Sequence, residues 1–137
     1  ALHWAYDDDM DMNQSIAVIM CDLNGLKKIN DSLGHPAGDK YICDAAEILV
    51  SCFDDQNVYR VGGDEFIIVL QGITKADLTI RTDRLQLYAD LKKISLSFGV
   101  SYRTNSKEHF ETLLREADKK MYVQKKHYYE NLSLSRE

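Results

Sequence analysis

Proline is scarce in this sequence, and Lys and Arg are outnumbered by Asp and Glu, 17 to 22. It has one proline and seven glycines in 137 residues, too few for a low-complexity linker, and its net charge is -5. Proteins that follow the phosphates of DNA or RNA usually carry a surplus of Lys and Arg, so we expect no nucleic-acid polymer as a partner. A small anionic ligand is not excluded, because a metal ion can neutralise its charge.

Long apolar runs and paired cysteines are absent as well. No apolar run approaches the length that spans a membrane, and no secretory signal is visible, so we expect no membrane contact by this domain. The three cysteines, Cys21, Cys43 and Cys52, are odd in number and include no CxxC pair. This usage is typical of reduced, buried thiols, and we expect a cytoplasmic protein.

The length and composition fit one globular domain, with 45% hydrophobic and 28% charged residues. The sequence begins at Ala1 without an initiator methionine. We therefore expect residues 1–137 to be a single domain excised from a longer multidomain protein, whose other segments could include a sensor or a membrane anchor. The acidic residues 1–14 are typical of a solvated loop or helix end.

Hydrophobic periodicity predicts alternating strands and helices. The run ISLSFGV, for example, places Ile94, Leu96, Phe98 and Val100 on one face, which predicts a strand with one buried face. We expect strands at residues 16–21, 57–61, 66–70 and 94–100, and helices at residues 24–34, 37–52, 74–92 and 107–128. The order β-α-α-β-β-α-β-α predicts an α/β (α+β) fold with a single mixed, mainly antiparallel sheet and flanking helices.

Two adjacent acids follow a pair of glycines in the stretch RVGGDEFIIVL, residues 60–70. The Gly-Gly pair predicts a tight hairpin in which both glycines take positive φ. Asp64 and Glu65 come next, and Asp22 directly follows the apolar run of residues 16–21. If that run pairs with the hairpin, Asp22 and Asp64 meet at one edge of the sheet.

Carboxylates held together raise each other's pKa, and a divalent cation removes that cost. One or two carboxylates, completed by substrate phosphates, are typical of a magnesium site, and glycines allow backbone and substrate to approach closely. Taken alone, the Gly-Gly-Asp-Glu turn is better explained as an ordinary solvated hairpin. Further motifs change that interpretation.

Three blocks of the sequence resemble the GGDEF family of diguanylate cyclases. They are RVGGDEF at residues 60–66, DLNGLKKINDSLGHPAGD at residues 22–39, and READKKMYVQKK at residues 115–126. The blocks stand in the family's order and at family-like spacing. One five-letter turn is weak evidence, whereas three ordered blocks are strong.

The resemblance implies a palm-like fold, similar to nucleotidyl cyclases and polymerase palms. It implies that two GTP become cyclic di-GMP and two pyrophosphates, the 3′-hydroxyl of each GTP attacking the α-phosphate of the other. Each domain would hold one GTP, so catalysis would require a homodimer of facing domains. The implied cofactor is Mg2+ or Mn2+, and the implied partners are GTP and the sensor or regulatory domains of the full-length protein.

The resemblance also implies roles for the acids. Asp22 and Asp64 would bind metal through their carboxylates and Leu23 through its backbone carbonyl. Glu65 would be a second catalytic acid beside Asp64, able to help deprotonate the 3′-hydroxyl. Two metal ions can lower the pKa of that hydroxyl and stabilise the charge on the phosphoryl group.

The remaining matched positions concern the phosphates. Gly62 and Gly63 would lie against them, and Lys27 and Lys125 match positions that contact the terminal phosphates. Lysine suits this role as a flexible point charge. Without the other blocks, each lysine is better explained as a surface residue.

Asn30 and Asp39 match the pair that reads guanine in the family. Guanine offers N–H donors that a carboxylate accepts, whereas adenine would leave a buried acid unpaired, so Asp39 favours GTP over ATP. The alternative roles are a helix cap for Asn30 and a favourable charge near a helix N-terminus for Asp39.

The sequence departs from the family's pattern in several places. Asn24 stands where many members have a second Asp, and Tyr128 and Tyr129 stand where the family often has Gly-Arg, with that Arg on the phosphates. The family's opening block is absent too, which indicates that the N-terminal part of the domain is missing. Phe53 and Gln56 replace the Arg and Asp of the RxxD product-inhibition site, so we expect no inhibitory site.

Three functions are consistent with these residues. The first is an active diguanylate cyclase, supported by the intact set of acids and the guanine pair. The second is a catalytically silent regulatory module that binds GTP, supported by the Tyr128-Tyr129 departure. The third is a purely structural domain, which predicts no stabilisation by GTP.

Overall fold

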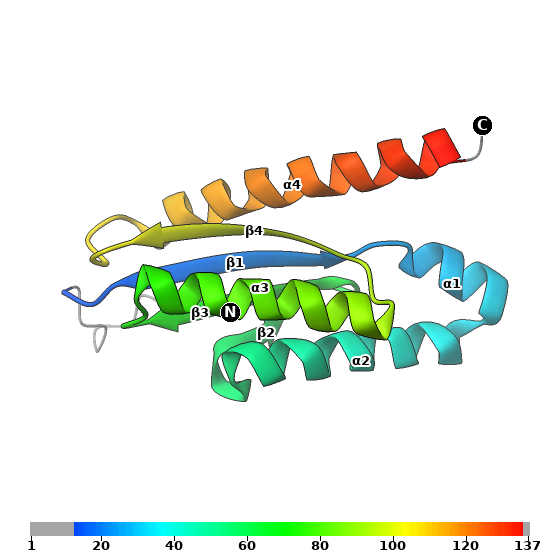
Figure 1. Cartoon of the computed structure of the whole chain (residues 1–137), viewed down its shortest axis with the longest axis horizontal. Coiled ribbons are helices and arrows are strands. Elements are labelled where there is room, and N and C mark those ends of the chain that lie inside the picture. Colours follow the sequence, from blue (N-terminus) through cyan, green and yellow to red (C-terminus); the bar gives the residue numbers. More distant parts are fainter. Residues whose placement is uncertain (1–12, 136–137) are drawn as a thin grey trace.

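Strands and helices follow one another in the expected order within residues 13–135, which the computed structural model describes (Figure 1). They are β1 (Ile16–Leu23), α1 (Leu26–Leu33), α2 (His35–Phe53), the short helix η2 (Asp55–Asn57), β2 (Val58–Arg60), β3 (Glu65–Gln71), α3 (Lys75–Lys92), β4 (Leu96–Arg103) and α4 (Phe110–Ser135). The acidic run that we expect to be a loop or helix end falls almost entirely outside the described residues.

The four strands form one sheet in the order β2-β3-β1-β4, and each neighbouring pair is antiparallel. The expected α/β fold with a single, mainly antiparallel sheet is confirmed. The parallel pairing that a mixed sheet would need does not occur among the described strands. Strands that run the same way are kept apart, because β3 separates β1 from β2 and β1 separates β3 from β4.

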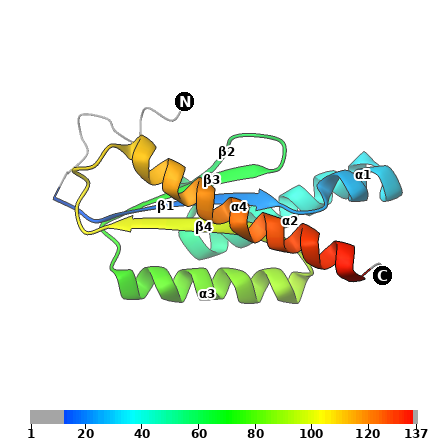
Figure 2. The same ribbon diagram turned by 90° about the horizontal axis from the view of Figure 1, so that it is seen from above.

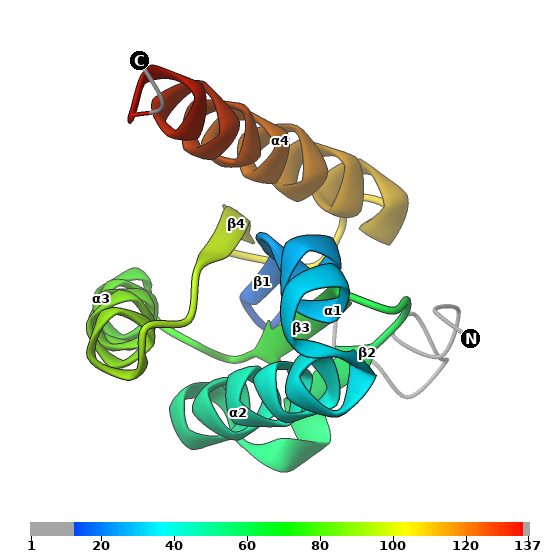
Figure 3. The same cartoon turned by 90° about the vertical axis from the view of Figure 1, so that its right-hand side faces the viewer.

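Helices cover both faces of the sheet, with α2 and α3 on one side and α4 on the other (Figure 3). Alternate residues of β1 serve the two layers, as the period of a strand requires. Ala17, Ile19 and Cys21 pack with α2 and α3, whereas Ile16 and Val18 belong to the cluster under α4. Asp22, which continues the second set, therefore lies on the α4 side.

Strand β4 is covered on both faces, whereas the sequence predicts one buried face, and the predicted hydrophobic face is only partly buried. Leu96, Phe98 and Val100 pack against the core of α2 and α3, as expected. Ser97, Gly99 and Ser101 on the opposite face are also buried, beneath α4. Small residues are needed there because the backbone of α4 lies close to the strand.

Helix α4 crosses the sheet diagonally, and its last turns extend beyond it (Figure 2). No helix among residues 13–135 is long and apolar enough to cross a membrane. Cys21 and Cys52 are buried as expected, but Cys43 is exposed, because it lies on the outer face of α2.

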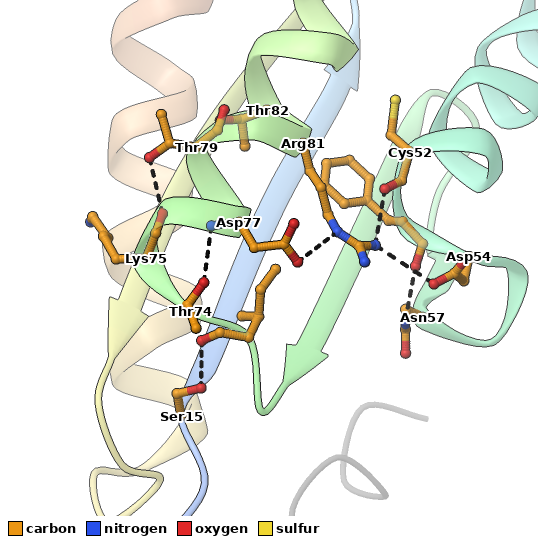
Figure 4. A network of polar contacts seen from close by, with 12 residues as sticks. Ser15, Cys52, Asp54, Asn57, Thr74, Lys75, Asp77, Thr79, Arg81 and Thr82 are labelled. Atoms are coloured by element: carbon orange, nitrogen blue, oxygen red, sulfur yellow. Dashed lines mark hydrogen bonds and ion pairs between the residues drawn. The ribbon is translucent and has the colours of Figure 1, made fainter.

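Arg81 ties α3 to the C-terminal end of α2 (Figure 4). Its Nε donates to Asp77 Oδ2 at 3.2 Å, and its Nη1 donates to the carbonyl of Cys52 at 3.2 Å. Nη1 also lies 3.6 Å from Asp54 Oδ2. This contact fixes the two helices on the same face of the sheet.

Candidate functional site

Three acids meet where β1 ends and β3 begins. Asp22, Asp64 and Glu65 each offer a carboxylate oxygen, and these oxygens all lie within 4.8 Å of one another. Asp22 is paired with Glu65 in the antiparallel register of β1 and β3. The amide of Leu23 donates to the carbonyl of Asp64 at 2.8 Å, which fastens the tip of the hairpin to the end of β1.

Asp22 is the buried member of this cluster. Its side chain is 3% exposed, and Lys125 Nζ of α4 donates to Oδ2 at 2.5 Å. The other oxygen, Oδ1, is buried without a hydrogen-bond partner among the described residues. Burial raises the pKa of Asp22; the hydrogen bond and charge of Lys125 oppose this, and the nearby Asp64 adds to it.

The pKa of Lys125 is raised as well. Partial burial lowers the pKa of its ammonium group, but the hydrogen bond and charge of Asp22, with a further contribution from Asp64, outweigh this and raise it. Lys125 is therefore a protonated cation held against the acid cluster. Lys27, its predicted partner in phosphate binding, is exposed in the first turn of α1 and has no ion pair within the described part of the chain.

The donor set fits a hard divalent cation. Three carboxylates supply oxygen ligands of the kind that Mg2+ prefers. The unpartnered Oδ1 of Asp22 could bind a cation without first losing a hydrogen bond. The ammonium of Lys125 already supplies the positive charge that such a cluster requires. Leu23 follows Asp22 directly, so its backbone carbonyl lies at the same end of β1 as the acids.

The glycines of the hairpin differ from expectation. Neither Gly62 nor Gly63 has positive φ, so the expected turn geometry is wrong. Val61 N donates to Glu65 O at 3.0 Å, which leaves three residues in the loop instead of two. An added Cβ would meet nothing within 4 Å at Gly63 and only ordinary contacts with Glu65 at Gly62. The chain's own backbone and packing therefore require neither glycine.

Arg60 holds this loop in place, a role that the hydrophobic pattern of the sequence does not predict. Its Nε donates to the carbonyl of Gly62 at 3.1 Å and its Nη2 to that of Gly63 at 2.8 Å. The sequence feature that could have predicted this role is an arginine two residues before a Gly-Gly pair. A forked donor at that position can reach both carbonyls of a short loop.

The predicted guanine-reading residues lie on α1 and α2. The Oδ1 of Asn30 is 1.7 Å from the position that a Cβ on Gly38 would occupy, so the Asn30 side chain lies directly against the residue that precedes Asp39. Helix α2 has no side-chain cap, and Asp39 lies beyond its first turn. The capping and helix-charge alternatives therefore do not describe these residues.

Asn24 stands where many members of the family it resembles have a second Asp, but its side chain does not join the acid cluster. Its side chain is buried beside β4, where Nδ2 donates to Ser95 Oγ and Oδ1 accepts from Ser97 Oγ, each at 3.0 Å. The hydroxyl of Tyr41 donates to the Asn24 carbonyl at 3.0 Å and accepts from the Ser95 amide at 2.9 Å. Asn24 therefore anchors the loop between β1 and α1.

Comparison with known proteins agrees with this geometry. The sequence model of the family described as "Diguanylate cyclase, GGDEF domain" matches residues 2–131. Diguanylate cyclase A of Treponema denticola is 29% identical over 133 residues, covering 90% of this chain and 36% of that protein. The cyclic di-GMP phosphodiesterase PdeR of Escherichia coli is 28% identical, covering 82% of this chain and 18% of its own length. The chain thus spans well under half of the length of these curated relatives.

A solved structure gives the same result. The active GGEEF domain of a diguanylate cyclase from Vibrio cholerae matches with a TM-score of 0.70 and 29% identity, covering 83% of this chain and 78% of that one. Because the family's sequence model covers nearly the whole chain and the fold matches, the chain belongs to the GGDEF domain family of diguanylate cyclases.

Proposed function

We propose that this domain is an active diguanylate cyclase, which condenses two GTP into cyclic di-GMP and two pyrophosphates. The observation that carries the proposal is the complete acid cluster of Asp22, Asp64 and Glu65, with one buried oxygen of Asp22 left unpartnered. A buried carboxylate held beside two others is costly, and a bound divalent cation would offset that cost.

Asp22 and Asp64 would hold Mg2+ or Mn2+, together with the carbonyl of Leu23. Bound metal would supply positive charge that lowers the pKa of the 3′-hydroxyl and offsets charge on the phosphoryl group. Glu65 would accept the hydroxyl proton, since it is partly exposed at the start of β3 and faces the same cluster. Lys125, freed from neutralising Asp22, would contact the phosphates.

The hairpin glycines support a ligand at this place. An added side chain at Gly63 would meet only open space, and at Gly62 only Glu65. This open space would let phosphates approach the backbone of the loop closely. Arg60 would keep the loop in the conformation that allows it.

The guanine end would be read by Asn30 and Asp39, and Lys27 would serve the phosphates. Asp39 is exposed and close in sequence to the residue that Asn30 touches, so both side chains can face one base. A carboxylate accepts hydrogen bonds from guanine but not from the corresponding edge of adenine. The domain would therefore prefer GTP to ATP.

Catalysis would require a second copy of the domain, because each copy would hold one GTP and the product joins two. We propose that the chain works as one domain of a longer protein, in which sensor or regulatory segments control this pairing. The small share of its relatives' length that it spans supports this arrangement.

The test is direct. Concentrated protein is incubated with GTP and Mg2+ or Mn2+, and cyclic di-GMP is measured by chromatography. We expect product from the parent and none from Asp64→Ala, with Asp118→Ala, an exposed acid of α4, as the matched control. Absence of product from a parent that binds GTP and dimerises would refute the cyclase.

A silent regulatory module that binds GTP is the second candidate. Two observations favour it: tyrosines stand at 128 and 129, and one relative of this chain is a phosphodiesterase. Both candidates predict that GTP with Mg2+ raises the melting temperature more than ATP with Mg2+, because the ligand binds only the folded state. A purely structural domain predicts no such rise.

A further inference from the structure

A cleft of about 500 Å³ lies between α1 and the last turns of α4. Lys27 and Lys28 line one wall, and Tyr128 and Tyr129 line the other. Asp31 also borders it, so the two lysines leave a net positive charge. The size suits part of a nucleotide, and the charge favours an anion.

Two residues that line the cleft are close in sequence to residues of the acid cluster or its ion pair. Gly25, which lines it, is three residues beyond Asp22 in the loop that leaves β1. Tyr128 is one helical turn beyond Lys125, whose ammonium bonds to Asp22. A ligand that extends from the acids along this side of the domain would enter the cleft.

The ring of Tyr128 lines this cleft and contacts its neighbours. It packs edge-to-face on Tyr129, with ring centroids 5.0 Å apart and planes at 85°. Its hydroxyl lies 3.3 Å from the position that a Cβ on Gly25 would occupy, so it sits directly over that loop. Gly25 has φ of 76°, which glycine adopts without strain.

The hydroxyl of Tyr128 has no hydrogen-bond partner within residues 13–135. The hydroxyl of the neighbouring Tyr41, by contrast, bonds to the backbone of Asn24 and Ser95. A half-buried phenol that points over a basic cleft is a donor available to an anionic ligand.

We propose that Tyr128 is a further specificity-determining residue, whose hydroxyl donates a hydrogen bond to the terminal phosphate of a nucleoside triphosphate lying in this cleft. Lys28 adds positive charge at the same place. The inference rests on the proposed function for the identity of the nucleotide, but not for the anion site itself. Because this hydroxyl would contact the terminal phosphate, a triphosphate would be distinguished from a monophosphate.

The experiment compares the whole chain with Tyr128→Phe, which removes only the hydroxyl. Binding of GTP, GMP and inorganic tripolyphosphate is measured by calorimetry in Mg2+, under conditions without turnover. We expect Tyr128→Phe to weaken GTP and tripolyphosphate about tenfold, as for loss of a hydrogen bond to a charged group, and to leave GMP unchanged. Lys28→Gln should act in the same direction.

Matched controls come from the same helix. Tyr122→Phe changes a tyrosine that is 65% exposed and does not line the cleft, and Lys119→Gln removes an exposed lysine away from it. Neither should change any of the three affinities. The melting temperature of Tyr128→Phe should match that of the parent, since its hydroxyl bonds to no described residue.

Three results would overturn the inference. Equal weakening of GTP and GMP would place the hydroxyl elsewhere on the nucleotide, and unchanged binding of all three probes would show that it contacts none. Stronger GTP binding by Tyr128→Ala would also overturn it, because Tyr128 would then be an obstruction. Tripolyphosphate separates the two proposals: loss of its binding in Tyr128→Phe supports the anion site even if the parent shows no preference for GTP and makes no cyclic di-GMP.

Discussion

At the scale of single residues, Asn30 keeps its position only because Gly38 has no side chain. An added Cβ would overlap the side-chain amide of Asn30 and not a backbone atom. That side chain is flexible and can move away. Gly38→Ala should therefore displace Asn30 and weaken GTP binding about five- to tenfold, the loss of one or two hydrogen bonds. Stability should change by less than about 1 kcal/mol, since alanine favours a helix. Calorimetry and thermal unfolding measure the two effects.

A double-mutant cycle checks that cause. If Gly38→Ala acts by moving Asn30, then Asn30→Ala should weaken GTP binding by a similar factor, and the double variant should be no weaker than either. Additive losses would mean that Gly38 contributes by another route, and the guanine role of Asn30 would lose its support.

If the acid cluster binds magnesium as proposed, the raised pKa of Asp22 should make that binding sensitive to pH. Burial raises this pKa above its ordinary value of 3.8, with Lys125 opposing the shift. The folded state thus holds the proton more tightly than the unfolded chain, so this group favours folding more as pH falls through the folded pKa. Mg2+ needs the ionised carboxylate and competes with that proton. The rise in melting temperature caused by Mg2+ should shrink on acidification, starting at a higher pH than an ordinary aspartate would give.

Thermal unfolding with and without Mg2+, measured from about pH 8 to about pH 5, tests this linkage. Asp22→Asn should show no Mg2+ effect at any pH, and Asp118→Ala should behave as the parent. A magnesium effect that stays constant down to the ordinary range of aspartate would contradict the raised pKa.

The sequence could predict which acids form the cluster, but not the residues that position the neighbouring loop and side chains. Asp22 and Asp64 stand at the ends of strongly apolar runs, and strand pairing alone brings such positions together. Arg60 and Gly38 carry no comparable pattern, because their roles depend on a loop conformation and on one close contact across two helices. Contacts of that kind arise only after the elements pack.

At the scale of elements, Gly99 decides how closely α4 packs on β4. A Cβ there would lie 2.1 Å from the carbonyl oxygen of Ala117 and 2.4 Å from the amide of Met121, both backbone atoms of α4. Since backbone cannot turn aside, Gly99→Ala should lower the free energy of unfolding by about 3 kcal/mol, or roughly 10 °C in melting temperature. Gly63→Ala, where the added methyl meets nothing, is the matched control. Equal stability of the two variants would show that α4 can lift without cost.

Element types and their order followed from periodicity, but β4 shows where periodicity fails. Its hydrophobic alternation correctly identified the face toward α2 and α3. The face under α4 is built from Ser97, Gly99 and Ser101, which a hydrophobic pattern assigns to solvent. Ser101 satisfies its hydroxyl by donating to the carbonyl of Leu113 at 2.7 Å. Close helix packing selects small residues whatever their polarity, so this burial is invisible to a pattern of hydrophobicity.

At the scale of the whole molecule, the two ends of the sheet differ in chemistry. The acid cluster lies where β1 ends, and a second cavity of about 610 Å³ lies at the other end, lined in part by Gln14 and Gln71. Its cation is Arg81, which already bonds to Asp77 and lies near Asp54 (Figure 4). Two acids and one arginine give this cavity a net negative charge, which disfavours a second anionic nucleotide.

This arrangement is consistent with the prediction that the domain has no product-inhibition site. Phe53, which stands in place of an arginine, is fully buried in the core and cannot reach a ligand, and Gln56 offers an uncharged amide. We expect the rate of cyclic di-GMP formation to be unaffected by added product in the submicromolar range. Binding gives an independent measurement: in Asp39→Ala, whose guanine reading is removed, labelled cyclic di-GMP should show no remaining tight site. An inhibition curve with a submicromolar plateau, or tight binding that Gln56→Ala abolishes, would refute the prediction, because either would require the cavity at Arg81 to accept an anion despite its two acids.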